Sequence, residues 1–578
     1  MSTHKHIDFI CVAVLFCTLL VTVLFMNGEA LGIKVIAADD DPDSGYTATD
    51  HFTGNDQNGD WKDPNATVIT LKGDSISVSG GGAYAYDGDV IITNAGHFIL
   101  SGSLSDGSII VDAYASSKVW IKLDGMDIHC QDGPCLRIEK AKKVFLTLAG
   151  GSENSFTDGG SYSEEMITQG IRAAICADDD LTINGSGSLT VKGKYRHGID
   201  CNDDLVITGG TLTVNAVKDG LHINNNLRIM AAQITIEAED DGILIQGKTG
   251  DDGSLTEGSG YFYMESGSLS VEAEDEAIKA YGAVTVAGGT LELRTDIGQG
   301  HHGIKSDTSI TVDGGSISVL QSYEGFAAPA ITVNDGEVAV YPYDDGFNAS
   351  AGGGDSFSMP GGQGGTGTFD ASASANSQDS TDMTPPEGGA AGSETSQSCG
   401  ITINGGSVTI INKSGSDADG LDSNGSIYIN GGTVLVSLVN NGNNCALDYG
   451  SESGGVCEIT GGTVIAAGNY SMAEGFSEGS SQCSLLYIVS EGVPAGTTVK
   501  LVSASDETVL LEQKVPASFS AIVLSCPEIR QGESYRIWCG DSCEEITIDS
   551  VSSSFGDAVS GGFNGPQGQG GGRQPGRP

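Results

Sequence analysis

The sequence predicts an all-β fold, a right-handed, three-sided parallel β-helix of about 22 residues per coil with a small C-terminal β-sheet or sandwich cap. One short phrase recurs along the chain, an acidic residue or His followed by Gly and then by an apolar residue. Its glycines Gly198, Gly220 and Gly242 are each 22 residues apart. Each period also contains three short runs of alternating apolar residues, separated by turns rich in Asn, Asp and Gly. Because strands of about four residues bury little surface alone, three per period must enclose a shared core and stack on their neighbours.

The turn that leads into each new coil has a constant length. Six positions separate Ile175 from Leu181, and six separate Ile199 from Leu205. Equal turns stack on one another at about 4.8 Å per rung, so that side chains of one type form ladders along the stack. The sequence therefore predicts acidic ladders at two corners of the coil.

The rest of the chain divides by composition. Residues 9–26 form an uninterrupted apolar run, which at about 1.5 Å per residue can span a bilayer. We expect a signal anchor or signal peptide at 1–30, a linker at 31–51 and an N-terminal β cap with the first coils at 52–170. The β-helix is expected at 171–484 with a disordered insertion at 350–398, followed by a C-terminal β module at 485–555 and a disordered Gly/Pro tail at 556–578. This organisation predicts an extracellular or cell-surface protein, either secreted or anchored in the membrane by residues 9–26.

Charge and cysteine content narrow the choice of partners. The formal net charge is −49, from 76 acids against 27 Lys and Arg, which argues against nucleic acid and favours cations as partners. Cys130 with Cys135, and Cys539 with Cys543, are close enough in sequence for local disulfides in an exported protein. Zinc binding by such pairs is the alternative.

The two acidic ladders are candidate calcium sites. Carboxylates stacked at the rung spacing repel one another by about 1 kcal/mol per pair in water, and Ca²⁺ takes six to eight oxygen ligands. The alternative is that Asp, Asn and Gly occur there because turns favour them. The candidate metal ligands are Asp179, Asp180, Asp203, Asp204, Asp219, Asp240, Asp241, Asp275 and Glu276.

A catalytic use of the same surface stays open. A lyase acting on acidic sugars needs calcium to neutralise the uronate and a Lys or Arg base to remove the C5 proton. Lys194, Arg196 and Lys218 are the candidate bases, although they can equally offset neighbouring acids. Tyrosines at outward positions, among them Tyr195 and Tyr263, are candidates for stacking on sugar rings.

The phrases "SENSFTDGGSYS", "AAICADDDLTINGSGSLTVKGKYRHGIDCNDDLVITGGTLTV" and "DGLHI" resemble the clostridial-type carbohydrate-binding family, whose fold is similar to pectate lyases. The resemblance covers about residues 50–540, apart from the low-complexity insertion. It implies an exported, calcium-binding parallel β-helix that binds cellulose or polygalacturonate. The family's acidic turn matches Asp179-Asp180 and Asp203-Asp204, but Asn224-Asn225-Asn226 has lost the charge at the next rung.

Together these observations favour a monomeric polysaccharide-binding protein, stabilised by or dependent on Ca²⁺. A calcium-dependent, pectate-type polysaccharide lyase is the second hypothesis, so enzymatic activity is left open. A structural adhesin or ice-binding solenoid is the third, although Thr182, Val206 and Arg228 are too irregular for an ice-binding array.

Overall fold

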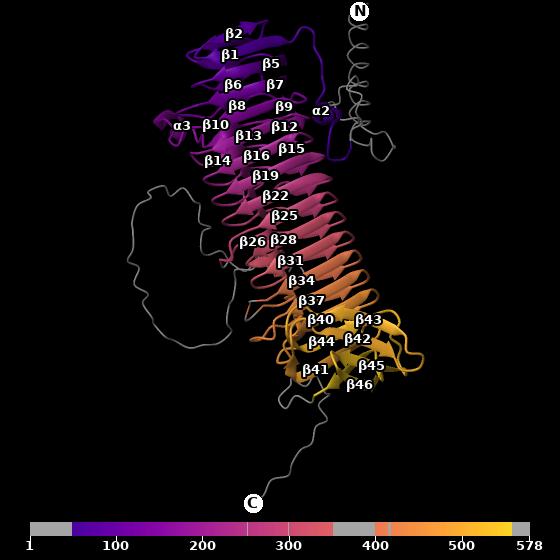
Figure 1. The fold of residues 1–578 in the computed structure, drawn as a ribbon. Coiled ribbons are helices and arrows are strands. Elements are labelled where there is room, and N and C mark those ends of the chain that lie inside the picture. The colour runs from indigo at the N-terminus through magenta and orange to yellow at the C-terminus, as the bar shows by residue number, and fades with distance from the viewer. Residues whose placement is uncertain are drawn as a thin grey trace, which may run out of the picture.

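The computed structural model describes residues 49–557, apart from 251–252, 299, 351–398, 414 and 416–417. The described chain forms an elongated stack of short strands with very little helix (Figure 1). The stack runs from β1 and β2 at one end to the C-terminal strands at the other. The expected anchor at residues 9–26 and nearly all of the expected insertion and tail lie outside the described residues. Within the described residues, no helix is both long and apolar enough to cross a bilayer.

Most strands pair in parallel with the equivalent strand one rung away, in three continuous series. The first ladder comprises β9 (Lys143–Leu148), β12 (Asp180–Gly185), β15 (Leu205–Ile207), β18 (Leu227–Ile229), β21 (Phe262–Met264), β24 (Val284–Val286), β27 (Ser309–Val312), β30 (Ala330–Val333), β33 (Gly400–Ile403), β36 (Ser426–Ile429) and β39 (Cys457–Ile459).

The second ladder comprises β10 (Glu153–Thr157), β13 (Ser188–Gly193), β16 (Thr211–Ala216), β19 (Ala232–Ala238), β22 (Gly267–Ala273), β25 (Thr290–Arg294), β28 (Ser316–Ser322), β31 (Glu337–Pro342), β34 (Ser407–Asn412), β37 (Thr433–Leu438) and β40 (Thr463–Gly468). The third ladder comprises β4 (Asp89–Ile92), β6 (Ile109–Asp112), β8 (Leu136–Lys140), β11 (Ala173–Ala177), β14 (His197–Cys201), β17 (Leu221–Ile223), β20 (Ile243–Ile245), β23 (Ile278–Ala280), β26 (His302–Ser306), β29 (Glu324–Ala327), β32 (Phe347–Ala349), β35 (Leu421–Ser423) and β38 (Leu447–Tyr449). These long parallel series confirm the all-β class and are consistent with a β-helix.

The N-terminal end of the stack is closed by antiparallel pairs. β1 (Thr67–Gly73) pairs with β2 (Ile76–Ser79), and β3 (Ala83–Tyr86) pairs with β4. β5 (Gly96–Leu104) and the long β7 (Lys118–His129) connect this end to the first two ladders, because β7 pairs with both β9 and β10. The short helix α3 (Glu164–Thr168) precedes β11.

The C-terminal strands form a mainly antiparallel unit that is joined to the end of the stack. β44 (Phe519–Ser525) pairs with β40 of the stack and with β41 (Ser484–Val493), which in turn pairs with β47 (Ser552–Gly556). A four-stranded sheet is built from β43 (Val509–Lys514), β42 (Thr498–Ser503), β45 (Ser534–Cys539) and β46 (Ser542–Thr547). This unit has its own apolar core, distinct from the core that runs along the stack.

The core explains why the chain repeats its phrase. Alternate strand residues point inward and stack on their equivalents, as Phe326 does on Phe347 with ring centroids 4.8 Å apart. The repeated Gly has a steric cause. A Cβ added at Gly325 would lie 2.3 Å from the carbonyl oxygen of Gly346 and 2.3 Å from Cγ1 of Val340. At this rung the third ladder packs so closely against its neighbours that only Gly fits, whereas the equivalent positions of three other rungs hold Ala174, Ala277 and Ala446.

An N-terminal segment unforeseen from the sequence crosses the outward face of the first ladder. It contains the helix α2 (Gly54–Gln57), beside the stack in Figure 1. Asp56 of this helix is buried, 2.8 Å from the Lys143 ammonium, and accepts a hydrogen bond of 2.6 Å from the Thr182 hydroxyl. Because this segment covers part of the first ladder, Thr182 is fully buried and cannot belong to an exposed hydroxyl array.

The expected disulfides are absent, and all eleven cysteines within the described residues are free thiols. In the β45–β46 hairpin, Cys539 pairs with Ser542, whereas Cys543 pairs with Trp538. Successive strand residues point to opposite faces, so Cys539 and Cys543 lie on opposite sides of the hairpin. Cys135 is fully buried, and its thiol donates to the carbonyl oxygen of Ile128, not to Cys130. The expectation of these two disulfides was therefore wrong.

Candidate functional site

A groove of about 810 Å³ lies on the outward surface of the second ladder. Its floor contains small residues, including Gly193, Ala216, Ala238 and Ala273 at the ends of successive strands. The turns that follow these strands contribute Lys194, Val217, Glu239, Glu274 and Asp296. Small floor residues beside larger turn residues leave an open channel that crosses the strands and follows the axis of the stack.

One polar side chain per rung lines this groove at the same register position. The strand pairings align them one over another across six strands, from β13 to β28. At the rung spacing of parallel strands, the row extends about 24 Å. Its members are Lys192, Asn215, Glu237, Glu272, Arg294 and Gln321.

Two glutamates of the row lie between a lysine and an arginine. Glu237 and Glu272 are direct cross-strand partners, and like charges in that position destabilise a sheet. Glu237 also accepts a 2.7 Å hydrogen bond from the Asn215 amide. Lys192 and Arg294 lie on either side of this pair along the row. The groove therefore offers hydrogen-bonding groups to a neutral polymer, whereas a polyanion at its centre needs a cation.

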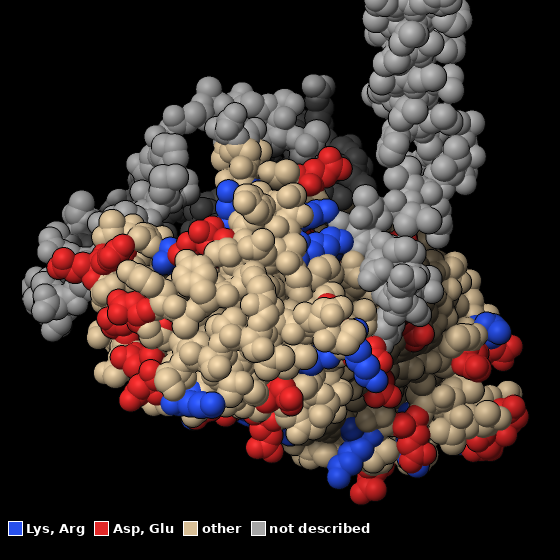
Figure 2. All heavy atoms as spheres, turned by 90° about the horizontal axis from the view of Figure 1, so that it is seen from above, with Lys and Arg blue, Asp and Glu red and all other residues tan. Residues whose placement is uncertain are grey.

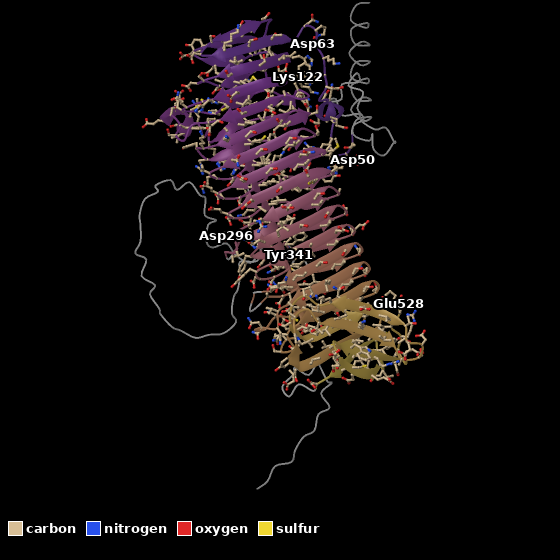
Figure 3. The ribbon with its side chains drawn as sticks, in the orientation of Figure 1. Asp50, Asp63, Lys122, Asp296, Tyr341 and Glu528 are labelled. Atoms are coloured by element: carbon tan, nitrogen blue, oxygen red, sulfur yellow. The ribbon has the colours of Figure 1, made fainter. Side chains whose placement is uncertain are left out.

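Hydroxyl groups continue the polar surface beside the groove. Two residues before the charged row, the outward positions of the second ladder are Thr190, Thr213, Thr235 and Ser270, again aligned rung over rung. In Figure 3, Asp296 and Tyr341 lie at a similar level of the stack. Tyr341 follows Val340, the partner of Val319 in β28, and is 41% exposed, so an aromatic ring is available close to Gln321 at the end of the row.

Two of the tyrosines expected to stack on sugars are already engaged. Tyr263 stacks on His51 of the N-terminal segment with ring centroids 3.7 Å apart. Tyr195 stacks on Tyr162 at 4.3 Å. Their sequence pattern showed an outward direction but not the segments that cover them.

Of the first predicted ladder, three acids come together. Oxygen atoms of Asp180, Asp203 and Asp204 lie within 4.8 Å of one another, whereas Asp179 accepts a hydrogen bond from the backbone N–H of Ala141. Burial raises the pKa of Asp180 to about 6.

Basic side chains already neutralise this first acidic group. Lys248 lies 2.7 Å from Asp203 and Arg228 lies 2.6 Å from Asp204. The hydrogen bond to Asp203 raises the pKa of Lys248. Since amide groups of Asn225 and Asn226 also donate to Asp204, few carboxylate lone pairs are left for calcium here.

The second predicted ladder divides into separate groups. Asp219 lies between two histidines, one rung before Asp241. Asp240 is 2.7 Å from the Lys218 ammonium. Oxygen atoms of Asp241, Asp275 and Glu276 lie within 4.8 Å of one another.

The Asp241, Asp275 and Glu276 group differs from the first group in keeping one buried carboxylate oxygen without a hydrogen-bond partner. Burial raises the pKa of Asp241 to about 9 and that of Asp275 to about 6. Lys279 lies 3.0 Å from Oε1 of Glu276, but Oε2 of Glu276 is buried without a hydrogen-bond partner. Burial alone would lower the pKa of Lys279, and the carboxylates of Asp241 and Glu276 raise it instead. Lys305 and His302 also lie within 4.0 Å of Glu276, so a Ca²⁺ ion here would compete with these basic side chains for the carboxylates.

Corner carboxylates also have a structural role that the sequence did not indicate. Asp241 accepts a hydrogen bond from the backbone N–H of Glu276 at 3.1 Å, and Asp345 accepts one from that of Asp419 at 2.7 Å. Asp419 repeats this contact with the N–H of Cys445. Each acid thereby caps the next rung, which explains part of the periodic acidity without a metal.

A further acidic group lies toward the C-terminal end of the third ladder. Oxygen atoms of Glu324, Asp344 and Asp345 lie within 4.8 Å of one another. In the same region Asp422 of β35 pairs directly with Asp448 of β38, and burial followed by the charge of Asp448 raises the pKa of Asp422 to about 7. Seen along the stack from its N-terminal end, acids are frequent around the rim (Figure 2).

The three candidate bases differ in their environments. Lys194 is exposed and lines the groove. Lys218 is paired with Asp240, and this hydrogen bond raises its pKa, which opposes a role as a base. The backbone carbonyl of Arg196 accepts a hydrogen bond from the N–H of Lys218. Only Lys194 among the three therefore has both the exposure and the place that a base in this groove needs.

Comparison with known proteins agrees with a carbohydrate-related role. Residues 86–346 match the family of carbohydrate-binding domain-containing proteins. The matched segment contains the groove, and the resemblance expected from the repeated phrases is confirmed over these residues.

Two individual proteins are similar to parts of the chain. A carbohydrate-binding domain-containing protein of Acetivibrio thermocellus is 37% identical over 144 residues, which cover 25% of this chain and 48% of that protein. The similarity therefore spans about half the length of this relative. A solved structure described as a polysaccharide lyase-like protein from C. thermocellum, in a gadolinium derivative, is 29% identical. That likeness covers 43% of this chain and 96% of the other, with a TM-score of 0.40.

Proposed function

We propose that the protein binds an extended polysaccharide of the plant cell wall, cellulose or polygalacturonate, along the groove of the second ladder. The observation that carries the proposal is the row of six polar side chains from Lys192 to Gln321, one per rung. Such a row suits an extended polymer, because every rung presents one polar side chain along the same line, although its charge differs from rung to rung. The family match over residues 86–346 supports a polysaccharide partner.

The proposal includes a right-handed, three-sided coil of about 22 residues, a monomeric state and a position outside the cell or at its surface, secreted or membrane-anchored. It also includes Ca²⁺ as a stabilising ion. Asp241, Asp275 and Glu276 would hold it, since their oxygens converge and Glu276 has an unpaired buried oxygen. The ion would bind the three carboxylates in competition with Lys279 and Lys305, which already lie within 4.0 Å of Glu276.

The acidic centre of the groove predicts different calcium requirements for the two polymers. Cellulose is neutral and needs no cation beside Glu237 and Glu272. Polygalacturonate brings a carboxylate to the same place, so its binding requires Ca²⁺ between polymer and protein.

Affinity measurements with each polymer test the proposal. We expect Arg294→Ala and the double variant Glu237→Gln/Glu272→Gln to change binding, the latter by making polygalacturonate binding less dependent on Ca²⁺. Glu337→Gln is the matched control, because Glu337 is an exposed residue of β31 outside the groove. Equal binding by all of these variants and by the wild-type protein would exclude the groove as the site.

A calcium-dependent lyase is the second candidate, and the position of Lys194 in the groove favours it. Removal of the C5 proton by this side chain, followed by loss of the C4 substituent, would leave an unsaturated product that absorbs in the ultraviolet. If this absorbance grows steadily with the wild-type protein but not with Lys194→Gln, the protein is a lyase. Binding without any growth of absorbance leaves a binding protein.

A further inference from the structure

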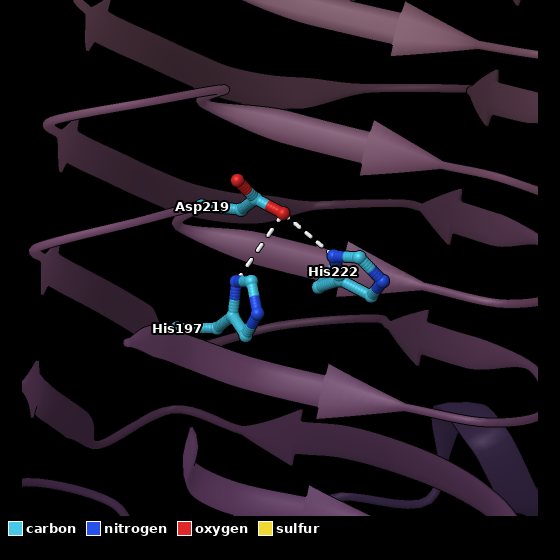
Figure 4. Close-up of side chains that lie close together, drawn as sticks. All are labelled: His197, Asp219 and His222. Carbon is cyan, nitrogen blue, oxygen red and sulfur yellow. Dashed lines mark hydrogen bonds and ion pairs between the residues drawn. The ribbon is translucent and has the colours of Figure 1, made fainter. Parts of the chain in front are cut away.

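Three side chains of the third ladder converge on one point inside a corner of the stack. Oδ2 of Asp219 lies 2.6 Å from Nδ1 of His222 and 3.2 Å from Nδ1 of His197 (Figure 4). His197 begins β14, and His222 is the central residue of β17 on the next rung. Exposed fractions are 2% for His197, 3% for Asp219 and 4% for His222, so solvent has almost no access to the cluster.

The hydrogen bonding of this cluster is incomplete. Both ring nitrogens of His197 and Nε2 of His222 are buried without a hydrogen-bond partner. Nδ1 of His197 faces Oδ2 of Asp219 at 3.2 Å, but the angle between them does not allow a hydrogen bond. A buried polar group left unpaired costs about 1–3 kcal/mol, so the arrangement is expensive unless something else binds these atoms.

Nearby charged groups do not complete the cluster. Asp200, the residue of β14 that pairs with His222, is bound by Arg172 at 2.8 Å. Lys218, next to Asp219 in sequence, is held by Asp240 at 2.7 Å. The cluster thus remains a self-contained set of two imidazoles and one carboxylate.

We propose that His197, Asp219 and His222 bind a divalent transition metal of the zinc type, through Nδ1 of each histidine and Oδ2 of the aspartate. Two imidazoles and a carboxylate are ligands that Zn²⁺ prefers, whereas Ca²⁺ takes oxygen ligands. At Zn–N and Zn–O lengths near 2.0–2.2 Å, tetrahedral ligand atoms lie about 3.3 Å apart. The His197 contact already has nearly this length, and the His222 ring moves outward by about 0.7 Å when the ion enters.

The position of the cluster gives the metal a structural role. His197 belongs to one rung, and Asp219 and His222 belong to the next, so one ion joins two consecutive coils. A ligand that binds the folded state alone stabilises it in proportion to the logarithm of its concentration over its Kd. The site therefore stabilises the middle of the stack against local separation of rungs, independently of polysaccharide binding.

The test uses the full chain, purified without a polyhistidine tag and freed of metal by a chelator. Zn²⁺ is titrated in competition with a chromophoric chelator, and Co²⁺ is added in a parallel sample to record its visible d–d absorption. We expect one high-affinity Zn²⁺ per chain, a rise in melting temperature on loading, and cobalt bands typical of nitrogen and oxygen ligands. A large excess of Ca²⁺ should not displace the zinc.

Two variants and a control locate the ion. Asp219→Asn and His222→Gln are expected to weaken Zn²⁺ binding at least tenfold and to remove the rise in melting temperature. His302→Gln is the matched control, because His302 is a buried histidine of the same ladder that lies beside Glu276 and Glu324 instead. It should retain wild-type Zn²⁺ affinity.

X-ray absorption at the zinc edge of the wild-type protein gives a second, mutation-free readout, with two imidazoles expected in the coordination shell. Absence of stoichiometric Zn²⁺ binding would overturn the proposal. So would binding unaffected by both variants, or a coordination shell without imidazole.

Discussion

Asp422→Asn is the substitution expected to reveal most about the acidic corner. Asp422 and Asp448 are direct partners on parallel strands, with no residue between them to separate their charges. Burial raises the pKa of Asp422 from 3.8 to about 7, and the charges of Asp448 and Glu324 add to this shift. The folded protein therefore retains a proton on Asp422 that the unfolded chain has released.

The sign of the pH dependence follows from this raised pKa. A carboxyl group whose pKa is higher in the folded state contributes its stability fully below pH 3.8, and this contribution is lost as the pH rises through about 7. A shift of about 3 units corresponds to at most about 4 kcal/mol at 1.36 kcal/mol per unit. Because Asp422 is only partly shielded from solvent, about 2 kcal/mol is the more realistic gain for Asp422→Asn at pH 8.5.

The assay is thermal unfolding between pH 5 and pH 8.5, with a chelator or with Ca²⁺. In the presence of a chelator, the melting temperature of the wild-type protein should fall as the pH rises. The melting temperature of Asp422→Asn should fall clearly less. Calcium should reduce the difference between the two proteins, because a bound cation relieves the same repulsion. Asp112→Asn, an exposed aspartate of β6 in the same ladder, should behave as wild type.

Parallel pH profiles of the wild-type protein and Asp422→Asn would refute this account of the corner. If Ca²⁺ left this difference unchanged, the repulsion between Asp422 and Asp448 would stand, but these two acids would bind no calcium.

Two further substitutions test the packing. Gly325→Ala places a methyl group 2.3 Å from the Gly346 carbonyl oxygen and should destabilise the stack by about 3 kcal/mol or more. Gly160→Ala is the control and should be neutral, because a Cβ there meets nothing within 4 Å. Urea unfolding midpoints measure both variants, and equal midpoints would contradict the steric reason for the repeated Gly. Asp56→Ala removes the carboxylate that lies 2.8 Å from the Lys143 ammonium beneath the N-terminal segment. We expect the free energy of unfolding to fall by about 3–5 kcal/mol and proteolysis of that segment to become faster. An unchanged melting temperature and an unchanged cleavage rate would show that this ion pair does not hold the segment.

The repeated elements were predictable because stacking imposes a short-range rule on the sequence. Leu205 over Leu227 and Leu221 over Ile243 follow from the period alone, since each apolar residue needs an equivalent above and below it. The sequence also indicated the acids that converge at Asp180, Asp203 and Asp204. Their basic partners were harder to foresee, because Lys248 reaches Asp203 from an insertion 45 residues further along the chain.

Features that do not repeat from coil to coil could not be predicted from the 22-residue period. The segment around Asp56 contacts Thr182, 126 residues away, through side chains with no repeating pattern. His222 was read only as part of a strand, although its spacing of three from Asp219 and the His197 of the preceding rung were a usable signal. The groove depends on small residues at strand ends, such as Ala216 and Ala238. Its depth could not be predicted without the positions of the larger turn residues beside them.

Carboxylate footprinting of the wild-type protein tests the central claim most directly. The protein is labelled with a carbodiimide and an amine, with and without cello-oligosaccharide or with oligogalacturonate plus Ca²⁺, and labelling is quantified by mass spectrometry. If the polysaccharide lies in the groove, Glu237 and Glu272 lose labelling when the sugar is present, while Glu337 on the same ladder is unchanged. Saturating sugar that leaves Glu237 and Glu272 as reactive as in the free protein would contradict the proposed site.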